Sequence, residues 1–267
     1  MELGIEGKVA VVTGGSKGIG RAISLRLARE GAQVAVIARG EQAIAETVAQ
    51  IESAGGTAIG LSADLAALAS YDRVIDEVRR KLGPPEIAVY NMETPLSGTF
   101  EQHDEAAFAY AFHIIVLCYM RMVKCVLPHM KQRGWGRIVT IGSGAAKQPV
   151  RGNLDFAYAL TNTVRVAALG MAKTVAWETA QHGITVNTIA TGAIETRAAL
   201  DWFADRARER GISPEAFVAG VVGQIPVGRL GLPEEMAGLC AYLCSDIAAY
   251  TTGEAILCDG GLTNAMP

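Results

Sequence analysis

The stretch KVAVVTGGSKGIG, residues 8–20, joins an apolar run to a glycine-rich turn and the start of a helical pattern. Its apolar part, VAVV, is typical of a strand buried on both faces of a parallel sheet. The first N–H groups of a helix lack partners within the helix, and the helix dipole favours an anion there. Gly14 permits a tight turn, while Gly18 and Gly20 let the backbone approach a pyrophosphate closely. This order of elements predicts a phosphate-binding site; the alternative is an ordinary glycine-rich turn.

The composition fits one large α/β domain. Of the 267 residues, 50% are hydrophobic, 19% are charged and 30 are glycine, and no repeat or linker divides residues 1–267. The net charge of −3 argues against nucleic-acid binding. The five cysteines lack metal-ligand spacing, so we predict no metal site and expect thiols in a reducing cytoplasm. The uncharged run 108–120 is shorter than the ~20 residues that span a bilayer, so no membrane segment is predicted.

Apolar runs alternate with helical periodicity along the chain, which indicates parallel strands joined by helices. After the first strand, the predicted strands lie at 33–38, 57–62, 86–91, 137–141, 185–189 and 250–261. The predicted helical segments are 41–54, 71–82, 103–133, 155–182 and 197–223, with the third interrupted or bent before Pro128.

The end of the strand at 33–38 bears on the choice of a dinucleotide. An acidic residue there hydrogen-bonds the ribose 2′-hydroxyl of NAD, whereas a basic residue tolerates the 2′-phosphate of NADP. Here the strand ends in Ala38-Arg39, without a carboxylate, and Lys17 lies in the glycine turn. Two cations and no anion favour NADP; the alternative is that Arg39 and Lys17 are ordinary solvated side chains.

Several motifs together resemble the short-chain dehydrogenase/reductase family, and in particular 3-oxoacyl-(acyl-carrier-protein) reductases. They are the T-G-x-x-x-G-x-G turn at 13–20, a Ser at the end of the strand at 137–141, Tyr158, and the stretch 173–192. The resemblance covers essentially the whole chain. It implies a single α/β domain of the doubly wound Rossmann type, with a seven-stranded parallel sheet and helices on both faces. It also implies that the segment 197–223 is a variable substrate lid. The cytoplasmic location is predicted from the cysteines and from the lack of a predicted membrane segment.

The resemblance implies roles for individual residues. Ser143 would orient a substrate carbonyl and Tyr158 would donate a proton to it, while Asn162 stands where the Tyr-x-x-x-Lys signature has its lysine. The cofactor NADP(H) would be held by Gly14, Ser16, Lys17, Gly18, Ile19, Gly20, Arg39, Asp64, Leu65, Asn91, Ile194 and Thr196. For Asp64, a role as a cap or turn residue is nearly as good an interpretation.

The chain departs from the family at other points of the site. After Asn91, where the family continues Ala-Gly, Met92-Glu93 follows, and a small insertion falls at 147–154. The active-site Asn of the family aligns with Ile114 or Ile115. The adjacent His113 is more often a core residue than a catalyst on such an apolar helix.

The lost lysine leaves Tyr158 without its usual cation. An unperturbed Tyr has a pKa near ~10 and stays neutral at pH 7, which suits carbonyl reduction better than alcohol oxidation. Arg165, seven residues along the same helix face, and Lys147 in the insertion are candidates to supply part of the missing charge.

Two functions remain open from the sequence. The first is an NADPH-dependent carbonyl reductase acting on a 3-oxoacyl group or similar ketone, free or linked to acyl-carrier protein or coenzyme A. The second is a catalytically impaired NADP-binding sensor or partner subunit, favoured by the altered signature. The strongly apolar segments 112–126 and 157–176 exceed what one sheet face needs, and they predict a homodimer or homotetramer.

Overall fold

The computed structural model describes residues 2–92, 97–149 and 158–265. Its centre is a seven-stranded sheet in the order β3-β2-β1-β4-β5-β6-β7, and every neighbouring pair is parallel. The strands are β1 (Val9–Thr13), β2 (Gln33–Ala38), β3 (Thr57–Ser62), β4 (Ile87–Tyr90), β5 (Gly136–Ile141), β6 (Ile184–Thr191) and β7 (Ala255–Cys258). The doubly wound fold predicted from the sequence is confirmed.

The strand order reverses at β1, which pairs with β2 on one side and β4 on the other. At such a switch point the connections leave in opposite directions, so a crevice opens at the carboxyl ends of the strands. The residues of β1 are all buried, because helices cover both faces of the sheet.

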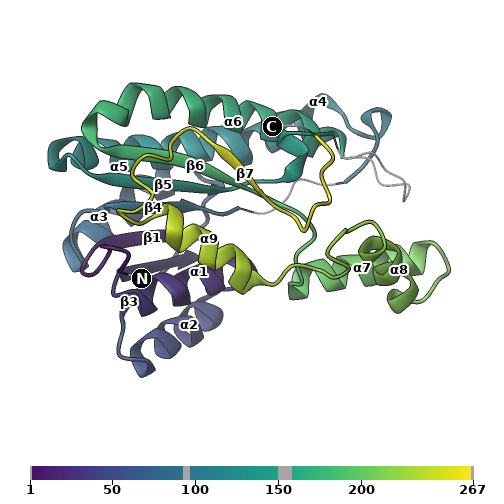
Figure 1. Cartoon of the computed structure of the whole chain (residues 1–267), viewed down its shortest axis with the longest axis horizontal. Helices are drawn as coiled ribbons and strands as arrows, with labels where there is room; N and C mark the ends of the chain where they lie inside the picture. The colour runs from purple at the N-terminus through teal and green to yellow at the C-terminus, as the bar shows by residue number, and fades with distance from the viewer. Residues whose placement is uncertain (1, 93–96, 150–157, 266–267) are drawn as a thin grey trace.

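One face is covered by α1 (Gly18–Arg29), α2 (Glu41–Ser53) and α9 (Pro233–Leu243), which lie together below the sheet in Figure 1. Their apolar sides, including Leu27, Ile51 and Cys240, form one core cluster with the sheet. The other face carries α3 (Ala69–Lys81), α5 (Cys118–Arg133) and α6 (Ala159–Thr179). The short 3₁₀ turns are η1 (Phe100–Gln102), η3 (Gly144–Ala146) and η4 (Ala180–His182).

The long helical run is interrupted by a π-helical turn. α4 (Glu105–Phe112) passes through η2 (His113–Leu117) into α5, and Pro128 lies inside α5 without ending it. The interruption therefore precedes Pro128, as predicted, but lies well before it. By length and composition the run Glu105–Arg133 could cross a membrane. In this fold Met122, Val126 and Met130 are buried against the sheet, as in a core helix.

The predicted lid segment forms two helices, α7 (Arg197–Glu209) and α8 (Pro214–Val222). They project to one side of the sheet, at the right of Figure 1. Phe203 and Phe217 pack together there in a small apolar cluster that is separate from the two main clusters.

Charged and aromatic side chains contact one another at the amino-terminal ends of the strands. The Lys8 Nζ donates to Glu86 Oε1 at 2.8 Å, linking the segments that enter β1 and β4. Two cations lie over the Trp135 ring, with Lys8 Nζ 4.4 Å and Arg137 Cζ 4.3 Å from its centroid. The Trp135 Nε1 donates to Asp246 Oδ1 at 2.7 Å. These contacts therefore lie at the opposite ends of the strands from the crevice.

Candidate functional site

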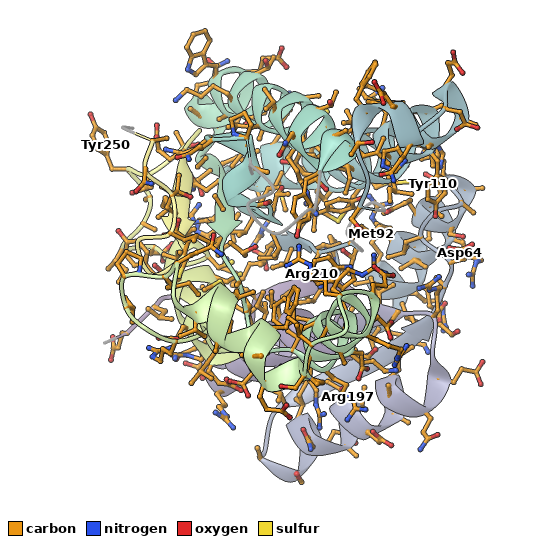
Figure 2. All side chains as sticks on the ribbon, turned by 90° about the vertical axis from the view of Figure 1, so that its right-hand side faces the viewer. Asp64, Met92, Tyr110, Arg197, Arg210 and Tyr250 are labelled. Carbon is orange, nitrogen blue, oxygen red and sulfur yellow. The ribbon has the colours of Figure 1, made fainter. Side chains whose placement is uncertain are left out.

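A large cleft of about 2750 Å³ lies at the carboxyl ends of the strands, beneath the lid. Figure 2 looks into its mouth, with the lid helices below and the layer of α4, α5 and α6 above. Most of the predicted site residues line it: Gly14, Ser16, Lys17, Gly18, Ile19, Arg39, Asp64, Leu65, Asn91, Ser143, Tyr158, Ile194 and Thr196. Gly20 and Asn162 are not among the described residues on its wall.

The glycine turn has the geometry that a phosphate cradle needs. Gly14 and Gly18 adopt positive φ values of 58° and 50°, which side chains rarely tolerate. A Cβ on Gly20 would lie 2.1 Å from the Gly14 carbonyl oxygen, so helix and turn approach each other as closely as backbones can. α1 has no side-chain cap and no acidic residue in its first turn. Its N–H groups and dipole are therefore available to an anion such as a pyrophosphate.

Asn91 supports this turn from the neighbouring strand. Its backbone N–H donates to Thr13 Oγ1 at 2.8 Å, and that hydroxyl donates to the Asn91 carbonyl oxygen at 3.0 Å. The Asn91 side-chain amide reaches the Gly14 carbonyl oxygen at 3.4 Å. The residue after β4 thus holds the glycine turn across the switch point while also facing the cleft.

The rim where the adenosine end of a dinucleotide would lie is basic. Lys17 and Arg39 are both exposed and both line the cleft. Asp64 accepts a hydrogen bond from the Ala66 N–H at 3.0 Å, so the turn role considered for it is present. Its side chain is exposed at the cleft, and Leu65 beside it is buried. These residues fit a 2′-phosphorylated adenosine.

The loop between β6 and the lid closes against the glycine turn. Thr196 caps α7 by accepting from the Ala199 N–H at 3.1 Å. A Cβ on Gly18 would meet the Thr196 methyl group at 3.2 Å. Ile194 is buried and pairs through a short bridge with Gly231. Ile194 and Thr196 therefore stand where they can contact a bound dinucleotide from the lid side.

Ser143 and Tyr158 face the same cleft. Ser143 follows β5, and its Oγ accepts from the Ala145 N–H at 3.2 Å at the start of η3. Tyr158 immediately precedes α6, and its ring centroid lies 6.4 Å from that of Trp202 in the lid. Burial raises the pKa of Tyr158, so its hydroxyl is protonated at neutral pH. Glu93, the insertion at 150–154 and the predicted helix start at Asp155 lie outside the described residues.

The face that α6 turns to the cleft carries Arg165, as its spacing from Tyr158 predicted, but not Asn162. Thr161 and Arg165 line the cleft with Tyr158, whereas neither Asn162 nor Lys147 is among the described residues that do so. The backbone N–H of Asn162 donates to the Tyr158 carbonyl oxygen at 2.7 Å. Helical spacing alone indicates that Thr161, three residues after Tyr158, lies on the same face of the helix as Tyr158. The sequence analysis did not use this signal.

The π-helical turn occupies the position of the family's active-site Asn. Ile114 and Ile115 are buried there, and the carbonyl of Ile114 accepts a hydrogen bond from the Tyr90 hydroxyl. Burial raises the pKa of Tyr90, which therefore acts as a neutral donor. His113 Nε2 lies 2.6 Å from the Ala66 carbonyl oxygen. This contact ties the helix to the loop after β3, as expected for a structural histidine.

Two further groups of residues lie on the cleft wall: one belongs to the predicted lid, and the other, from the C-terminal tail, was not predicted. From the lid come Trp202 and Arg210, and Figure 2 shows Arg210 near the centre of the mouth, between the lid and the side where Met92 and Tyr110 lie. From the C-terminal tail come residues 262–265, and the Asn264 N–H donates to Gln148 Oε1 at 2.8 Å. The tail has no periodic pattern, so the sequence offered no signal for its place.

Proteins with similar sequences include several reductases. Residues 14–263 match the protein family described as enoyl-(acyl carrier protein) reductase. The 3-oxoacyl-[acyl-carrier-protein] reductase FabG of Pseudomonas aeruginosa is 34% identical over 263 residues, covering 97% of this chain and 99% of the relative. Dehydrogenase/reductase SDR family member 4 of Oryctolagus cuniculus is 32% identical over 260 residues, covering 97% of this chain and 95% of the relative.

Solved structures with the same fold also include reductases. The L-sorbose reductase of Gluconobacter frateurii, complexed with NADPH and L-sorbose, superposes with a TM-score of 0.93 at 29% identity, covering 100% of both chains. A 3-oxoacyl (acyl-carrier-protein) reductase of Agrobacterium tumefaciens with NADP bound gives a TM-score of 0.87 at 30% identity, covering 97% of this chain and 96% of that chain. The extent of these matches, together with the glycine turn, shows that the chain belongs to the short-chain dehydrogenase/reductase family.

Proposed function

We propose that this protein is an NADPH-dependent oxidoreductase that reduces a ketone to an alcohol. One observation carries the proposal: Ser143 and Tyr158 share a cleft with the uncapped N-terminus of α1 and its glycine turn. A phosphate cradle and a proton donor in one cleft are the two requirements of hydride-transfer reduction. The NADPH- and NADP-bound reductases with the same fold support this proposal.

Each residue has a distinct part in the proposed reaction. Bound NADPH supplies the hydride. The Tyr158 hydroxyl donates its proton to the carbonyl oxygen, and the Ser143 hydroxyl orients that oxygen by a hydrogen bond. Asn162, at the lysine position of the family signature, supplies no charge. We therefore assign the protein to reduction, for which a protonated Tyr158 is the required form.

The proposed substrate is a 3-oxoacyl compound or a similar ketone, carried on acyl-carrier protein or coenzyme A or free in the cytoplasm. The similarity to 3-oxoacyl-[acyl-carrier-protein] reductases supports this choice. Aromatic lid residues line the cleft on the side proposed for the substrate, where Trp202 packs against Phe203 and Phe217 at ring-centroid distances of 5.6 and 6.4 Å. An apolar acyl chain would pack against these rings.

Turnover of purified protein tests the proposal. We expect steady loss of NADPH with a set of 3-oxoacyl thioesters, diketones and ketoses, and formation of one alcohol for each NADPH consumed. Tight NADPH binding with no turnover of any of these ketones would overturn the proposal in favour of a non-catalytic NADP-binding protein.

The basic rim predicts the choice of cofactor. We expect NADPH to bind at least about tenfold more tightly than NADH, because charge-assisted contacts from Lys17 and Arg39 to the 2′-phosphate contribute about 1.4 kcal/mol or more. The double change of Lys17→Ala and Arg39→Ala should remove most of this preference. Lys131→Ala, at the exposed end of α5, is the matched control. Calorimetry at moderate salt checks this, and equal affinity of the unchanged protein for both nucleotides would contradict it.

The outer helices predict self-association into a homodimer or homotetramer. Phe112 on α4 and Val166 on α6 are large apolar side chains that remain 42% and 51% exposed in the single chain. Covering them in a two-fold symmetric interface removes apolar area from water. Light scattering should give a multiple of 28.1 kDa, and the double change of Phe112→Glu and Val166→Glu should lower it. A monomer at micromolar concentration before any change would refute this prediction.

A further inference from the structure

One face of the lid helix α7 turns two arginines toward the cleft. Trp202, Arg206 and the C-cap residue Arg210 are spaced by four residues, so they lie along one face of the helix, and all three line the cleft. Figure 2 shows Arg210 near the centre of the mouth. Arg208 lies on another face: its side chain is 78% exposed, and it pairs with Asp205 at 3.0 Å. The cleft therefore receives two guanidinium groups from the lid.

Aromatic rings of the lid hold both of these guanidinium groups. The Arg206 Cζ lies 6.0 Å from the centroid of the Trp202 ring, and the Arg210 Cζ lies 5.5 Å from that of Phe217 on α8. An aromatic ring attracts a positive charge without neutralising it. The rings therefore fix where the two charges lie and leave them positive.

Basic groups outnumber acidic groups on this side of the cleft. The charged residues that α7 and its C-cap contribute to the described wall are Arg197, Arg206 and Arg210 against Asp201 and Glu209. Asp201 pairs with Arg197 at 2.8 Å, and Glu209 pairs with Arg206. The Arg206 Nε–H is buried and has no acceptor among residues 2–92, 97–149 and 158–265, so one carboxylate does not saturate this guanidinium. The lid thus places positive charge beside an apolar wall, where it attracts an anion more strongly than in open water.

The phosphates of a bound dinucleotide do not account for Arg206 and Arg210. Thr196, which caps α7, lies against Gly18, so this helix begins beside the proposed phosphate cradle. An α-helix rises about 1.5 Å per residue, which puts Arg206 and Arg210 roughly 15 and 20 Å farther along its axis. The two arginines therefore lie away from the cradle and need a different anion.

The same face of α7 passes the proposed proton donor. The Trp202 ring centroid lies 6.4 Å from that of Tyr158, and Arg206 follows Trp202 by one helical turn. A ketone whose carbonyl meets the Tyr158 hydroxyl would extend past the Trp202 ring before its far end met the two arginines. An anion bound there would be several bonds away from the carbonyl.

We propose that Arg206 and Arg210 bind an anionic group, a carboxylate or a phosphate, at the far end of the ketone substrate. This inference rests on the proposed carbonyl reduction and narrows its substrates to ketones that carry a negative charge several bonds from the carbonyl. Guanidinium groups bind carboxylate and phosphate oxygens through charge-assisted hydrogen bonds. The apolar chain between the two ends would pack against Trp202 and Phe217.

Oxo acids compared with their esters test the proposal. The series is 4-oxopentanoate, 6-oxoheptanoate and 8-oxononanoate, each beside its methyl ester and an oxoalkyl phosphate of matching length. We expect kcat/KM for the best acid to exceed that for its ester at least about tenfold, the size expected for hydrogen bonds to a charged group. Added salt should reduce this advantage. The larger advantage, for carboxylate or for phosphate, identifies the anion.

Arg206→Met and Arg210→Met remove the charges and keep the apolar length of the side chains. Each should lower kcat/KM for the acid toward that of its ester, and each tests a separate guanidinium if the other variant fails to fold. Arg208→Met is the matched control, since it makes the same change on another face of the same helix. It should keep the preference for the acid. All three variants should bind NADPH as the unchanged protein does.

Binding without turnover separates this inference from the proposed reaction. Calorimetry on the NADP⁺-loaded protein compares heptanoate with heptanamide, neither of which contains a ketone. We expect heptanoate to bind more tightly, and Arg206→Met and Arg210→Met to remove most of the difference. Equal binding of the two, equal kcat/KM for acid and ester, or weaker NADPH binding in these two variants would overturn the inference. A clear preference for heptanoate without reduction of any ketone would count against the proposed reaction alone.

Discussion

Replacing Tyr158 with Phe is expected to slow NADPH-dependent carbonyl reduction by about 10²–10⁴-fold, the usual contribution of a positioned general acid. The Phe ring keeps the contact with Trp202, whose centroid lies 6.4 Å from that of Tyr158, so the cleft should keep its shape. NADPH affinity should change little, because one hydroxyl is a small part of the cofactor contact. Measuring kcat beside the Kd for NADPH separates the lost proton donor from a damaged binding site.

The pH dependence of the reaction rates gives a second test of Tyr158 as the proton donor. Burial raises the pKa of Tyr158 above its usual value of ~10, so the proton-donating form is complete at neutral pH. Reduction should therefore be independent of this group through neutral pH and fall only as the pH rises through that high pKa. Alcohol oxidation, which needs the phenolate, should be slow at pH 7 and increase with pH. Asn162→Lys should lower the pKa of Tyr158 and raise oxidation more than reduction at neutral pH.

Full activity in Tyr158→Phe would place the proton donor elsewhere. His113 would be the next residue to change, although its contact with the Ala66 carbonyl directs it toward the loop after β3. In that case His113→Gln, which keeps a hydrogen-bond donor, would separate a catalytic role from a structural one.

Gly20→Ala is expected to damage cofactor binding and stability together. Its Cβ would lie 2.1 Å from the Gly14 carbonyl oxygen and 2.7 Å from the Gly14 carbonyl carbon. Both atoms belong to the backbone, so no side-chain rotation relieves the overlap, and α1 or the glycine turn has to move. We expect the free energy of unfolding to fall by about 3 kcal/mol, the upper end of the usual cost of overpacking, and NADPH affinity to fall at least about tenfold.

Gly170→Ala is the control for this change. Gly170 lies in the middle of α6, and a Cβ there would have no neighbour within 4 Å in the part of the chain that the structure describes. Ala in a helix interior is more stable than Gly by roughly 0.5–1 kcal/mol, so this variant should melt higher and bind NADPH normally. Denaturant unfolding and nucleotide titration compare the two. Wild-type NADPH affinity in Gly20→Ala would show that the glycine turn is not the phosphate site.

The fold could be predicted because its signals are local. The runs QVAVIA and TAIGLS were predicted as strands and are β2 and β3 with the same bounds. Strand ends that depend on partners were less certain: β6 is Ile184–Thr191, longer than the predicted 185–189, because it pairs along its length with β5 and β7. The glycine turn was predicted for the same local reason, since backbone geometry decides which residues it tolerates.

The residues of α6 that line the cleft were harder to predict, because they depend on which face this helix turns to the cleft. The comparison of signatures directed attention to Asn162, which is not on the described wall of the cleft. Arg165, a candidate from its helical spacing, does line the cleft, and Thr161, which was not predicted, lies there with it. The rotation of α6 is set by packing of Val164, Ala168 and Ala172 against neighbouring helices and the sheet, and no short motif encodes that packing. The place of residues 262–265 depends on long-range contacts such as that of Asn264 with Gln148.

The contacts at the amino-terminal ends of the strands have a practical consequence for protein engineering. Lys8, Trp135, Arg137 and Asp246 lie at the amino-terminal ends of the strands, while the cleft proposed to bind nucleotide and substrate lies at the carboxyl ends. Substitutions that widen the substrate range therefore need not touch the residues that secure the strands. A library restricted to the lid and the C-terminal tail should keep a large share of folded members, whereas one that includes Trp135 or Arg137 should lose many to unfolding before any change of specificity can be selected.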